Sequence, residues 1–554
     1  MKPFAISLAL VLALVALTLP VRGLAALLAG GSGVVEGPLI TGVWLLKGIL
    51  LTLAFLALAA WRTGPWHSVE RPLATPLPIA RSPREPVWQL ALGITLLVAA
   101  LLRLTHLGDG LWFDEIQTLV DYVRYPLSHI ISTYDSQNNH LFYSLLAKLS
   151  VMTFGEGAFA LRLPAAVFGV LSIWALFEFG RRVTSQREAF LATALLTVSY
   201  HHVWFSQNAR GYTGLLLGTL VGTAAFLRLV STAQPTWSAI LWYGLSMALA
   251  IYIHLTAVLV VAAHAVIWMV LIWHNRREAP RAAVLPMLWA LALAGSLALA
   301  LYALVLPQLP GTLFGSGGPS HATQWQRPIW LLTESLRGLS RGFPGGPIIL
   351  VMGLVVAASG WVSFWRRSPT VAVLMVLPAV LTAAAAVVLS HNLWPRLFFF
   401  SAGFGVLIAI RGMFAISDAL VPARASAIAT GLASAVVLLS ALTMPRAWGP
   451  KQDFAGAAEL VETSMGSNDA VVTVDLTNYP YRDFLNRSWD SVASIEALRT
   501  IEQSHTRTWV LYTFPVRLST AQPDIWHHLQ TSYDTAAVFP GTIGGGSVVV
   551  MVTR

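Results

Sequence analysis

The feature that most constrains this chain is a long series of apolar runs, each about as long as a bilayer core is thick. A helix needs about 20 mostly apolar residues to cross a hydrocarbon core of about 30 Å. Such runs lie at 4–19, 39–60, 88–107, 159–180, 189–204, 212–230, 238–253, 255–273, 283–306, 347–365, 370–390, 396–416 and 425–443. Charged residues make up only 11% of the chain, against roughly 25% in soluble domains. The sequence therefore predicts an all-α polytopic membrane protein with about 13 transmembrane helices, and it excludes a soluble enzyme, a disordered chain and a fibrous repeat.

The arginines indicate how the chain crosses the membrane. Many fall in loops that the alternation of runs places on one side, namely Arg62, Arg71, Arg81, Arg84, Arg181, Arg182, Arg187, Arg276, Arg277, Arg281, Arg366 and Arg367. Cytoplasmic loops carry an excess of lysine and arginine, so we expect this side to be cytoplasmic. The segments 108–159 and 307–346 and everything after Met444 then lie outside. Lys47, inside the second run, is expected to snorkel or to face another helix.

Net charge and cysteine content narrow the function further. The formal net charge is +10, but the basic residues are dispersed rather than gathered in one tract, which does not favour nucleic-acid binding. The chain has no cysteine, which excludes a disulfide framework, a thiolate metal site and a cysteine nucleophile.

The composition changes after the last apolar run. The pattern there predicts an amphipathic helix over 453–463 and β-rich strands at 470–476, 508–514 and 547–553. No nucleotide-binding glycine fingerprint is present in this part of the sequence. We therefore expect three parts, which are two extra N-terminal membrane helices with a cytoplasmic linker (1–87), a membrane core (88–445) and a small extracytoplasmic α/β domain (446–554).

The first predicted outer loop carries two adjacent carboxylates. Asp114 and Glu115 directly follow Trp112 and Phe113. Carboxylates at a membrane surface are costly to desolvate unless they react or are paired. A structural interpretation stays open beside the catalytic one, in which Asp114 caps a short helix and Glu115 lies in its first turn.

Basic side chains follow at the same predicted membrane face. His140 precedes an amphipathic stretch, Arg162 lies at the outer end of an apolar run, and Arg210 lies in the next outer turn. Together with the carboxylates they suit a base that faces an acceptor hydroxyl and cations that face a phosphate leaving group. His201 and His202 are interpreted as one ligand and one interfacial histidine rather than a metal pair, because adjacent helical residues point about 100° apart.

The order of these motifs resembles a known family. The motifs are Leu111-Trp-Phe-Asp-Glu, Asn139-His140, Ala160-Leu-Arg-Leu-Pro and Ser206-Gln-Asn-Ala-Arg-Gly-Tyr, with Tyr252-Ile-His254 and Pro395-Arg396 at later outer helix ends. They resemble glycosyltransferase family 39, the relatives of protein O-mannosyltransferases and of the aminoarabinose transferase of lipid A. The resemblance covers about residues 88–445 and implies the GT-C membrane fold.

The resemblance implies transfer of a sugar from a polyprenyl-phosphate donor to a lipid, glycan or protein acceptor at the outer face of a bacterial cytoplasmic membrane, with inversion. It implies that Asp114 is the catalytic base and that Glu115 orients the acceptor or a bound cation. Donor-phosphate binding carries over to His140, Arg162, Arg210 and Arg396, and substrate binding to Tyr143, Tyr212 and His254. For Arg396, anchoring of a helix at the lipid headgroups stays open as well. A divalent cation is left open as a cofactor, and no metal ligand is assigned.

Two other functions compete with this one. A transporter or flippase would carry ionisable residues at mid-membrane and an internal repeat; the later runs are almost free of carboxylates and show no repeat. A catalytically degenerate relative could act as a membrane scaffold or assembly subunit, but Asp114, Glu115 and Arg162 are all present. The sequence therefore favours the enzyme.

Overall fold

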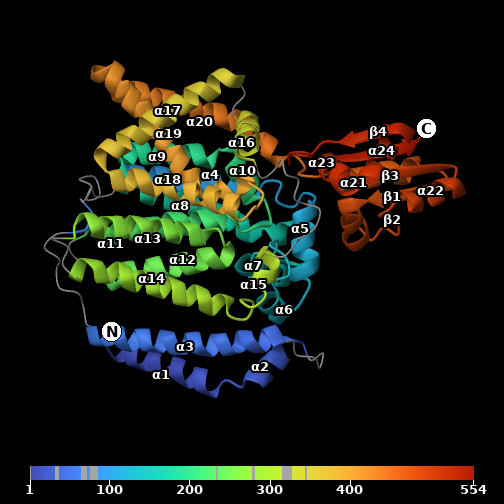
Figure 1. The fold of residues 1–554 in the computed structure, drawn as a ribbon. Helices are drawn as coiled ribbons and strands as arrows, with labels where there is room; N and C mark the ends of the chain where they lie inside the picture. Colours follow the sequence, from blue (N-terminus) through green and yellow to red (C-terminus); the bar gives the residue numbers. More distant parts are fainter. Residues whose placement is uncertain are drawn as a thin grey trace.

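A computed structural model describes residues 2–30, 37–63, 72–74, 85–232, 235–276, 281–314, 327–342 and 346–554. The protein has two parts, which are a stack of long helices and a C-terminal domain that lies beside one end of the stack (Figure 1). The lowest layer in Figure 1 consists of α1 (Lys2–Thr18), α2 (Val21–Leu28) and α3 (Gly37–Thr63). The next layer contains α11 (Tyr212–Ser231), α12 (Trp237–Ile253), α13 (Ala257–His274) and α14 (Arg281–Tyr302).

The remaining long helices lie above these layers. They are α4 (Pro86–Leu104), α8 (Ala158–Val183), α9 (Gln186–Thr197), α17 (Gly346–Arg367), α18 (Pro369–Val388), α19 (Ala402–Leu420) and α20 (Ala425–Thr443). Shorter elements in the stack are α10 (Tyr200–Ser206), α15 (Leu309–Phe314), α16 (Pro328–Gly342) and the 3₁₀ turns η4 (Pro395–Ser401), η5 (Pro422–Arg424) and η6 (Met444–Trp448). The all-α membrane architecture predicted from the apolar runs is confirmed.

Each predicted run coincides with helix, but not each with one unbroken span. Among the described residues, nine helices are long and apolar enough to cross a membrane, or ten if α1 and α2, bent by 83°, count as one span. Pro20 separates α1 from α2, as expected of a residue that cannot continue a helix. The run 189–204 is divided between α9 and α10. The exact number of 13 crossings stays a prediction.

Small residues allow close helix packing in the stack. A Cβ atom added at Gly360 of α17 would collide with the backbone of Ile408, and one added at Gly412 of α19 would collide with the carbonyl of Val356. Glycine is required at both positions because the two helix backbones touch there. Such small-residue contacts are typical of helices that associate within lipid, where burial of apolar surface supplies no driving force.

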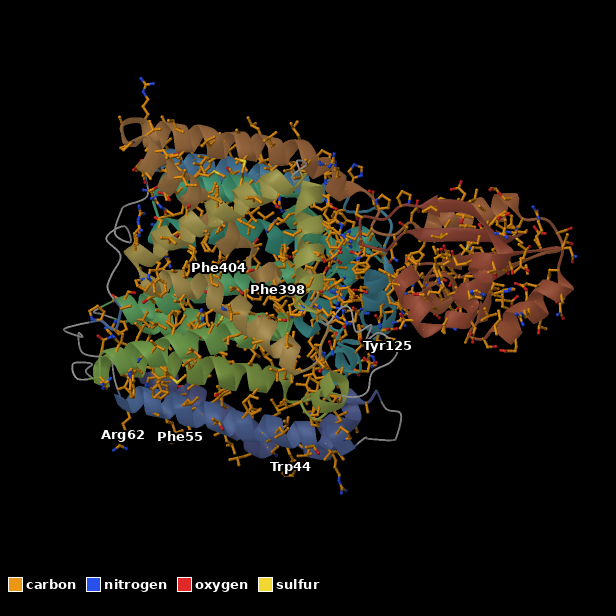
Figure 2. The ribbon with its side chains drawn as sticks, turned by 45° about the horizontal axis from the view of Figure 1, so that its top comes forward. Trp44, Phe55, Arg62, Tyr125, Phe398 and Phe404 are labelled. Carbon is orange, nitrogen blue, oxygen red and sulfur yellow. The ribbon has the colours of Figure 1, made fainter. Side chains whose placement is uncertain are left out.

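The arginine-bearing loops meet at one end of the stack. The backbone N–H of Glu85 donates to Gln186 Oε1 at 3.3 Å, and Asn275 Nδ2 donates to the Leu73 carbonyl at 3.1 Å. Arg62 lies at the end opposite the C-terminal domain, whereas Tyr125 lies beside that domain (Figure 2). Arg71, Arg81, Arg84 and Arg277, used in the sequence argument, lie outside the described residues. The Nζ of Lys47 donates to the Leu19 carbonyl at 2.8 Å, in the break between α1 and α2.

The C-terminal domain contains a five-stranded sheet. Its elements are α21 (Phe454–Ser464), β1 (Asp469–Val474), η7 (Asp475–Thr477), η8 (Pro480–Phe484), β2 (Asp490–Val492), α22 (Ile495–Ser504), β3 (Arg507–Tyr512), α23 (Pro515–Ala521), α24 (Pro523–Ser532), β4 (Tyr533–Phe539) and β5 (Val548–Thr553). The strand order is β2-β1-β3-β5-β4, with β2, β1 and β3 mutually parallel and β5 antiparallel to both of its neighbours. The predicted small α/β domain is confirmed, including the helix and the three strands expected from the sequence.

The two faces of this sheet have different neighbours because successive strand residues point to opposite sides. One face packs on α22, α23 and α24 through residues such as Val472, Val510 and Leu529. The other packs on α21 and on the segment between α4 and α8, which we call the α4–α8 segment (residues 105–157). A single buried cluster joins Leu111, Ile116 and Leu119 of that segment to Phe454, Val461 and Trp509 of the domain. The domain is therefore docked on the α4–α8 segment rather than tethered to it.

Candidate functional site

The α4–α8 segment holds the two adjacent carboxylates on a short helix. The segment contains α5 (Phe113–Thr118), a π-helical turn η2 (Leu119–Val123), α6 (Leu127–Ser132) and α7 (Leu141–Phe154). Asp114 and Glu115 are in the first turn of α5, where negative charge is favoured. Because adjacent helical residues point in different directions, the two side chains enter different environments.

Glu115 is fully buried and paired with Arg162. The pair is bidentate, with Arg162 Nη2 at 2.6 Å and Nε at 2.7 Å from the two carboxylate oxygens. The Ala209 N–H also donates to Glu115, at 2.7 Å. Burial raises the pKa of the Glu115 carboxyl, but the positive charges of Arg162 and Lys451 and these hydrogen bonds outweigh it and hold the pKa below its ordinary value.

Arg162 has no donor left for a ligand. Its remaining N–H groups donate to the carbonyls of Leu107, Asp109 and Gly110 at 2.8–3.2 Å, so all five guanidinium donors are used. Only 2% of its side chain is exposed. The sequence prediction placed Arg162 at the donor phosphate and Glu115 at the acceptor or a cation. In the structure both side chains hold the turn that precedes α5, and their roles at a ligand stay predictions.

Asp114 lies on the accessible side of α5. Its side chain is 17% exposed, and its Oδ2 is 3.3 Å from Arg396 Nη1. Arg396 comes from η4, at the start of α19, and its guanidinium lies over the ring of Trp394 with 5.2 Å to the ring centroid. The side chain of Arg396 is 35% exposed. The structure thus brings together one carboxylate and one cation that both retain access to a ligand.

Arg210 joins this pair through Asn138. Arg210 Nη1 donates to the backbone carbonyl of Asn138 at 2.8 Å and to its side-chain oxygen, and Asn138 Nδ2 donates to the Asp114 carbonyl at 3.1 Å. Among the described residues, Arg210 Nε is buried without a hydrogen-bond partner. A buried donor that lacks an acceptor is costly, which is expected of a group that awaits an anionic ligand.

His140 and His254 form an aromatic wall beside the two arginines. Their rings are 4.7 Å apart and perpendicular, and Tyr212 lies 5.6 Å from His140 and 5.4 Å from His254. Burial and the positive charge of Arg210 lower the pKa of both histidines, that of His254 to about 3, so both rings are neutral. His140 Nδ1 accepts a hydrogen bond from the Gly211 N–H at 3.0 Å, which leaves the ring proton on Nε2.

Tyr143, for which the sequence suggested substrate binding, is fully buried in the packed cluster. Its hydroxyl donates to the Leu161 carbonyl at 2.7 Å. The structure gives this residue a packing role between α7 and α8.

The sequence analysis missed the contribution of the C-terminal domain. Gln452 accepts a hydrogen bond from the Phe113 N–H at 3.0 Å and donates to Thr513 at 2.9 Å, so it connects the start of α5 to the end of β3. Lys451 donates to the Gln207 carbonyl at 2.6 Å, and burial lowers its pKa to about 7. The signal in the sequence was limited to the two polar residues Lys451 and Gln452, which follow Pro450 shortly after the last apolar run.

Of the two adjacent histidines, His202 is held by other protein side chains. His202 is buried, with its Nδ1 2.6 Å from Arg103 Nη2 and its Nε2 2.9 Å from the Ser172 hydroxyl, so both ring nitrogens are engaged. Within the described ranges, no group of three or more potential metal ligands comes together.

Comparisons with known proteins identify the fold that carries this site. Residues 139–305 match the family model of dolichyl-phosphate-mannose-protein mannosyltransferases. The crystal structure of ArnT from Cupriavidus metallidurans in the apo state superposes with a TM-score of 0.50 at 13% identity, covering 83% of this chain and 97% of that one. The chain has the GT-C fold. The resemblance to family 39 and the GT-C architecture predicted from the motifs are thereby confirmed.

Other GT-C structures are also similar to the chain. ArnT from Cupriavidus metallidurans bound to undecaprenyl phosphate gives a TM-score of 0.47 at 12% identity over 84% of this chain and 98% of that one. The Archaeoglobus fulgidus oligosaccharyltransferase tethered with an acceptor peptide gives 0.47 at 11% identity over 84% and 74%. A search of curated proteins finds no match. The family model matched by residues 139–305 supports a glycosyltransferase activity at the level of the family.

Proposed function

We propose that this GT-C protein transfers a sugar from a polyprenyl-phosphate donor to a hydroxyl group of a lipid, glycan or protein acceptor. The observation that carries the proposal is that the two adjacent carboxylates have different partners and different exposure to solvent. Glu115 forms a buried ion pair with Arg162, whereas Asp114 faces the accessible Arg396. The matching family model describes enzymes whose sugar is carried on dolichyl phosphate, and a polyprenyl carrier suits a site at the end of a membrane bundle.

In the proposed reaction, Asp114 accepts the proton of the acceptor hydroxyl while the oxygen attacks the anomeric carbon. The bond between that carbon and the phosphate oxygen breaks, and the electron pair leaves with the polyprenyl phosphate. One such displacement inverts the anomeric centre. Arg396, Arg210 and the Nε2–H of His140 stabilise the negative charge that develops on the phosphate. Tyr212 and His254 line the site beside them.

The contact between Arg396 and Asp114 implies that donor and acceptor bind in a fixed order. In the structure its guanidinium neutralises Asp114. The phosphodiester of the donor shares one negative charge between two oxygens, and arginine binds phosphates through two parallel hydrogen bonds. The donor therefore competes for Arg396 and releases Asp114 to act as a base. The donor therefore binds before the acceptor is activated.

The membrane orientation follows from the arginines. Loops bearing Arg62, Arg181 and Arg276 lie at predicted cytoplasmic ends of the helices, and Arg62 is at the end opposite the C-terminal domain (Figure 2). We therefore assign the site and the domain to the outer face of a bacterial cytoplasmic membrane.

A transfer assay on purified protein tests the function. The protein is supplied with a panel of radiolabelled polyprenyl-phosphate sugars, and wild type is compared with Asp114→Asn. Asp109→Asn is the matched control, because Asp109 lies in the same segment with a side chain that is 52% exposed and paired with His106. Sugar transfer or carrier release should be lost in Asp114→Asn and kept in Asp109→Asn. Full activity of Asp114→Asn would refute the assignment of Asp114 as the base. A folded wild-type protein that transfers no sugar from any donor would favour the scaffold function.

A further inference from the structure

A small cavity lies outside the cluster around Asp114. Its volume is about 200 Å³, and it opens between α5 and the C-terminal domain. Its walls include Phe113, Gln117, Asp475, Asn478, Tyr479 and Arg482. Two of these residues come from α5, the helix that bears Asp114, and the others from the turns that follow β1.

The cavity occupies a favoured position on the sheet. In open α/β sheets, ligands bind outside the carboxyl ends of parallel strands, where neighbouring connections leave in opposite directions. Here the chain runs from β1 to β2 at one edge of the sheet, whereas it runs from β3 to β4 at the other edge. Asp475 directly follows β1 with φ 50°, and Phe514 follows β3 with φ 49°. Left-handed backbone at two non-glycine residues is strained, and such strain gathers at functional sites.

The lining residues suit a neutral, hydroxyl-rich ring. The rings of Phe113 and Tyr479 lie 5.9 Å apart at 57° and offer apolar faces, while Gln117 and Asn478 offer planar amide groups. The charged lining residues are already paired, Asp475 with Arg517 and Arg482 with Asp483, both at 2.9 Å. An anion therefore gains little here. The volume is below the roughly 300–1,000 Å³ of pockets for larger ligands, which favours a single sugar ring.

The cavity is also next to the reacting group. Phe113 directly precedes Asp114, and consecutive Cα atoms are only about 3.8 Å apart. The cavity therefore borders the same turn of α5 that carries Asp114, and a glycan chain bound there can extend toward the Asp114 carboxylate. We propose that this cavity binds one sugar residue of a glycan acceptor, next to the residue whose hydroxyl reacts. The inference rests on the proposed glycosyltransferase function and names the acceptor class.

The test is ligand binding to the full-length protein in detergent micelles. Saturation-transfer NMR is recorded with methyl glycosides of glucose, galactose, mannose and N-acetylglucosamine. Asn478→Trp fills the cavity, and Asn468→Trp is the matched control, because Asn468 is exposed at the opposite end of β1. Gln117→Ala is a milder variant, which removes one of the two amide groups and leaves both aromatic rings in place. We expect at least one glycoside to bind wild type and Asn468→Trp, to lose its signal in Asn478→Trp, and to bind Gln117→Ala roughly tenfold more weakly, because one hydrogen bond to the ring is lost.

Two parallel measurements separate this inference from the proposed function. Binding of undecaprenyl phosphate, followed by native mass spectrometry, should be equal in wild type and Asn478→Trp. If undecaprenyl phosphate binds but no glycoside does, the cavity assignment fails alone; if undecaprenyl phosphate does not bind wild type, the donor class proposed for the enzyme fails. A panel of serine- and threonine-containing tripeptides is tested in the same way, and cavity-dependent binding of a tripeptide without any glycoside would overturn the glycan class.

Discussion

The buried pair between Glu115 and Arg162 makes a quantitative prediction. Glu115→Gln keeps the size of the side chain but removes the charge that opposes Arg162, whose side chain is 2% exposed. Three hydrogen bonds shorter than 3 Å, two from Arg162 and one from the Ala209 N–H, would lose their charged acceptor. Breaking a buried pair in this way costs about 3–5 kcal/mol, because the remaining charge stays uncompensated.

The same segment supplies an exposed pair as a control. Arg124 and Glu156 are 2.8 Å apart, with side chains 36% and 46% exposed. Exposed pairs contribute only about 0–1 kcal/mol, since water screens them. Glu156→Gln should therefore lower the free energy of unfolding by less than about 1 kcal/mol, although both variants remove one carboxylate from an arginine.

Equilibrium unfolding by SDS titration in mixed micelles, followed by tryptophan fluorescence, measures both changes. The double variant Glu115→Gln/Arg162→Gln should recover part of the loss, because no buried charge is left alone. Equal losses for Glu115→Gln and Glu156→Gln would refute the reasoning. So would a Glu115→Gln protein that unfolds like wild type but has lost its transfer activity, since this result would return Glu115 to the acceptor role suggested by the sequence.

Three further outcomes follow from the site. Arg396→Ala should lower transfer by about 10²–10³-fold, as loss of one preorganised charge does at other sites, with partial rescue by Arg396→Lys; equal rates for Ala and wild type in the transfer assay would exclude Arg396 from the site. Gly211→Ala should lower transfer without unfolding the protein, because the added methyl group would approach His140 Nδ1 to 2.8 Å and press on Ile253; a change in melting temperature without a change in rate would contradict this. Burial lowers the pKa of Lys451 from 10.5 to about 7, so between these pH values the unfolded chain binds more protons and the free energy of unfolding should rise with pH. SDS titrations at pH 7 and pH 9 should show this rise in wild type and not in Lys451→Met.

Much of the membrane core is predictable from the sequence because lipid imposes one strong rule, that long apolar runs become helices. The breaks are harder to foresee, as in the run 189–204, where α9 ends at Thr197 and α10 starts at Tyr200. In the C-terminal domain, β4 was missed because its burial does not alternate and its pairing with β5 shifts register near Thr535.

The sequence predicts which residues gather at the site, but it does not predict what each of them contacts there. The motifs gather Asp114, Glu115, His140 and Arg210 at one end of the stack, as the alternation of helices requires. No local pattern shows that Glu115 turns inward to an arginine 47 residues away. The contacts made by Lys451 and Gln452 are equally invisible, because they depend on how a separate domain docks.

That docking sets the timing of assembly during synthesis. Phe113 and Gln452 are bonded to each other but are 339 residues apart in the chain. At about 5–20 residues per second, a ribosome needs roughly 20–70 s to reach Gln452 after it has made the α5 helix. During that interval Leu111, Ile116 and Leu119 have no apolar partner from the last domain. Until about the last hundred residues have been made and folded, the newly synthesised chain therefore lacks the contact between Gln452 and the start of α5.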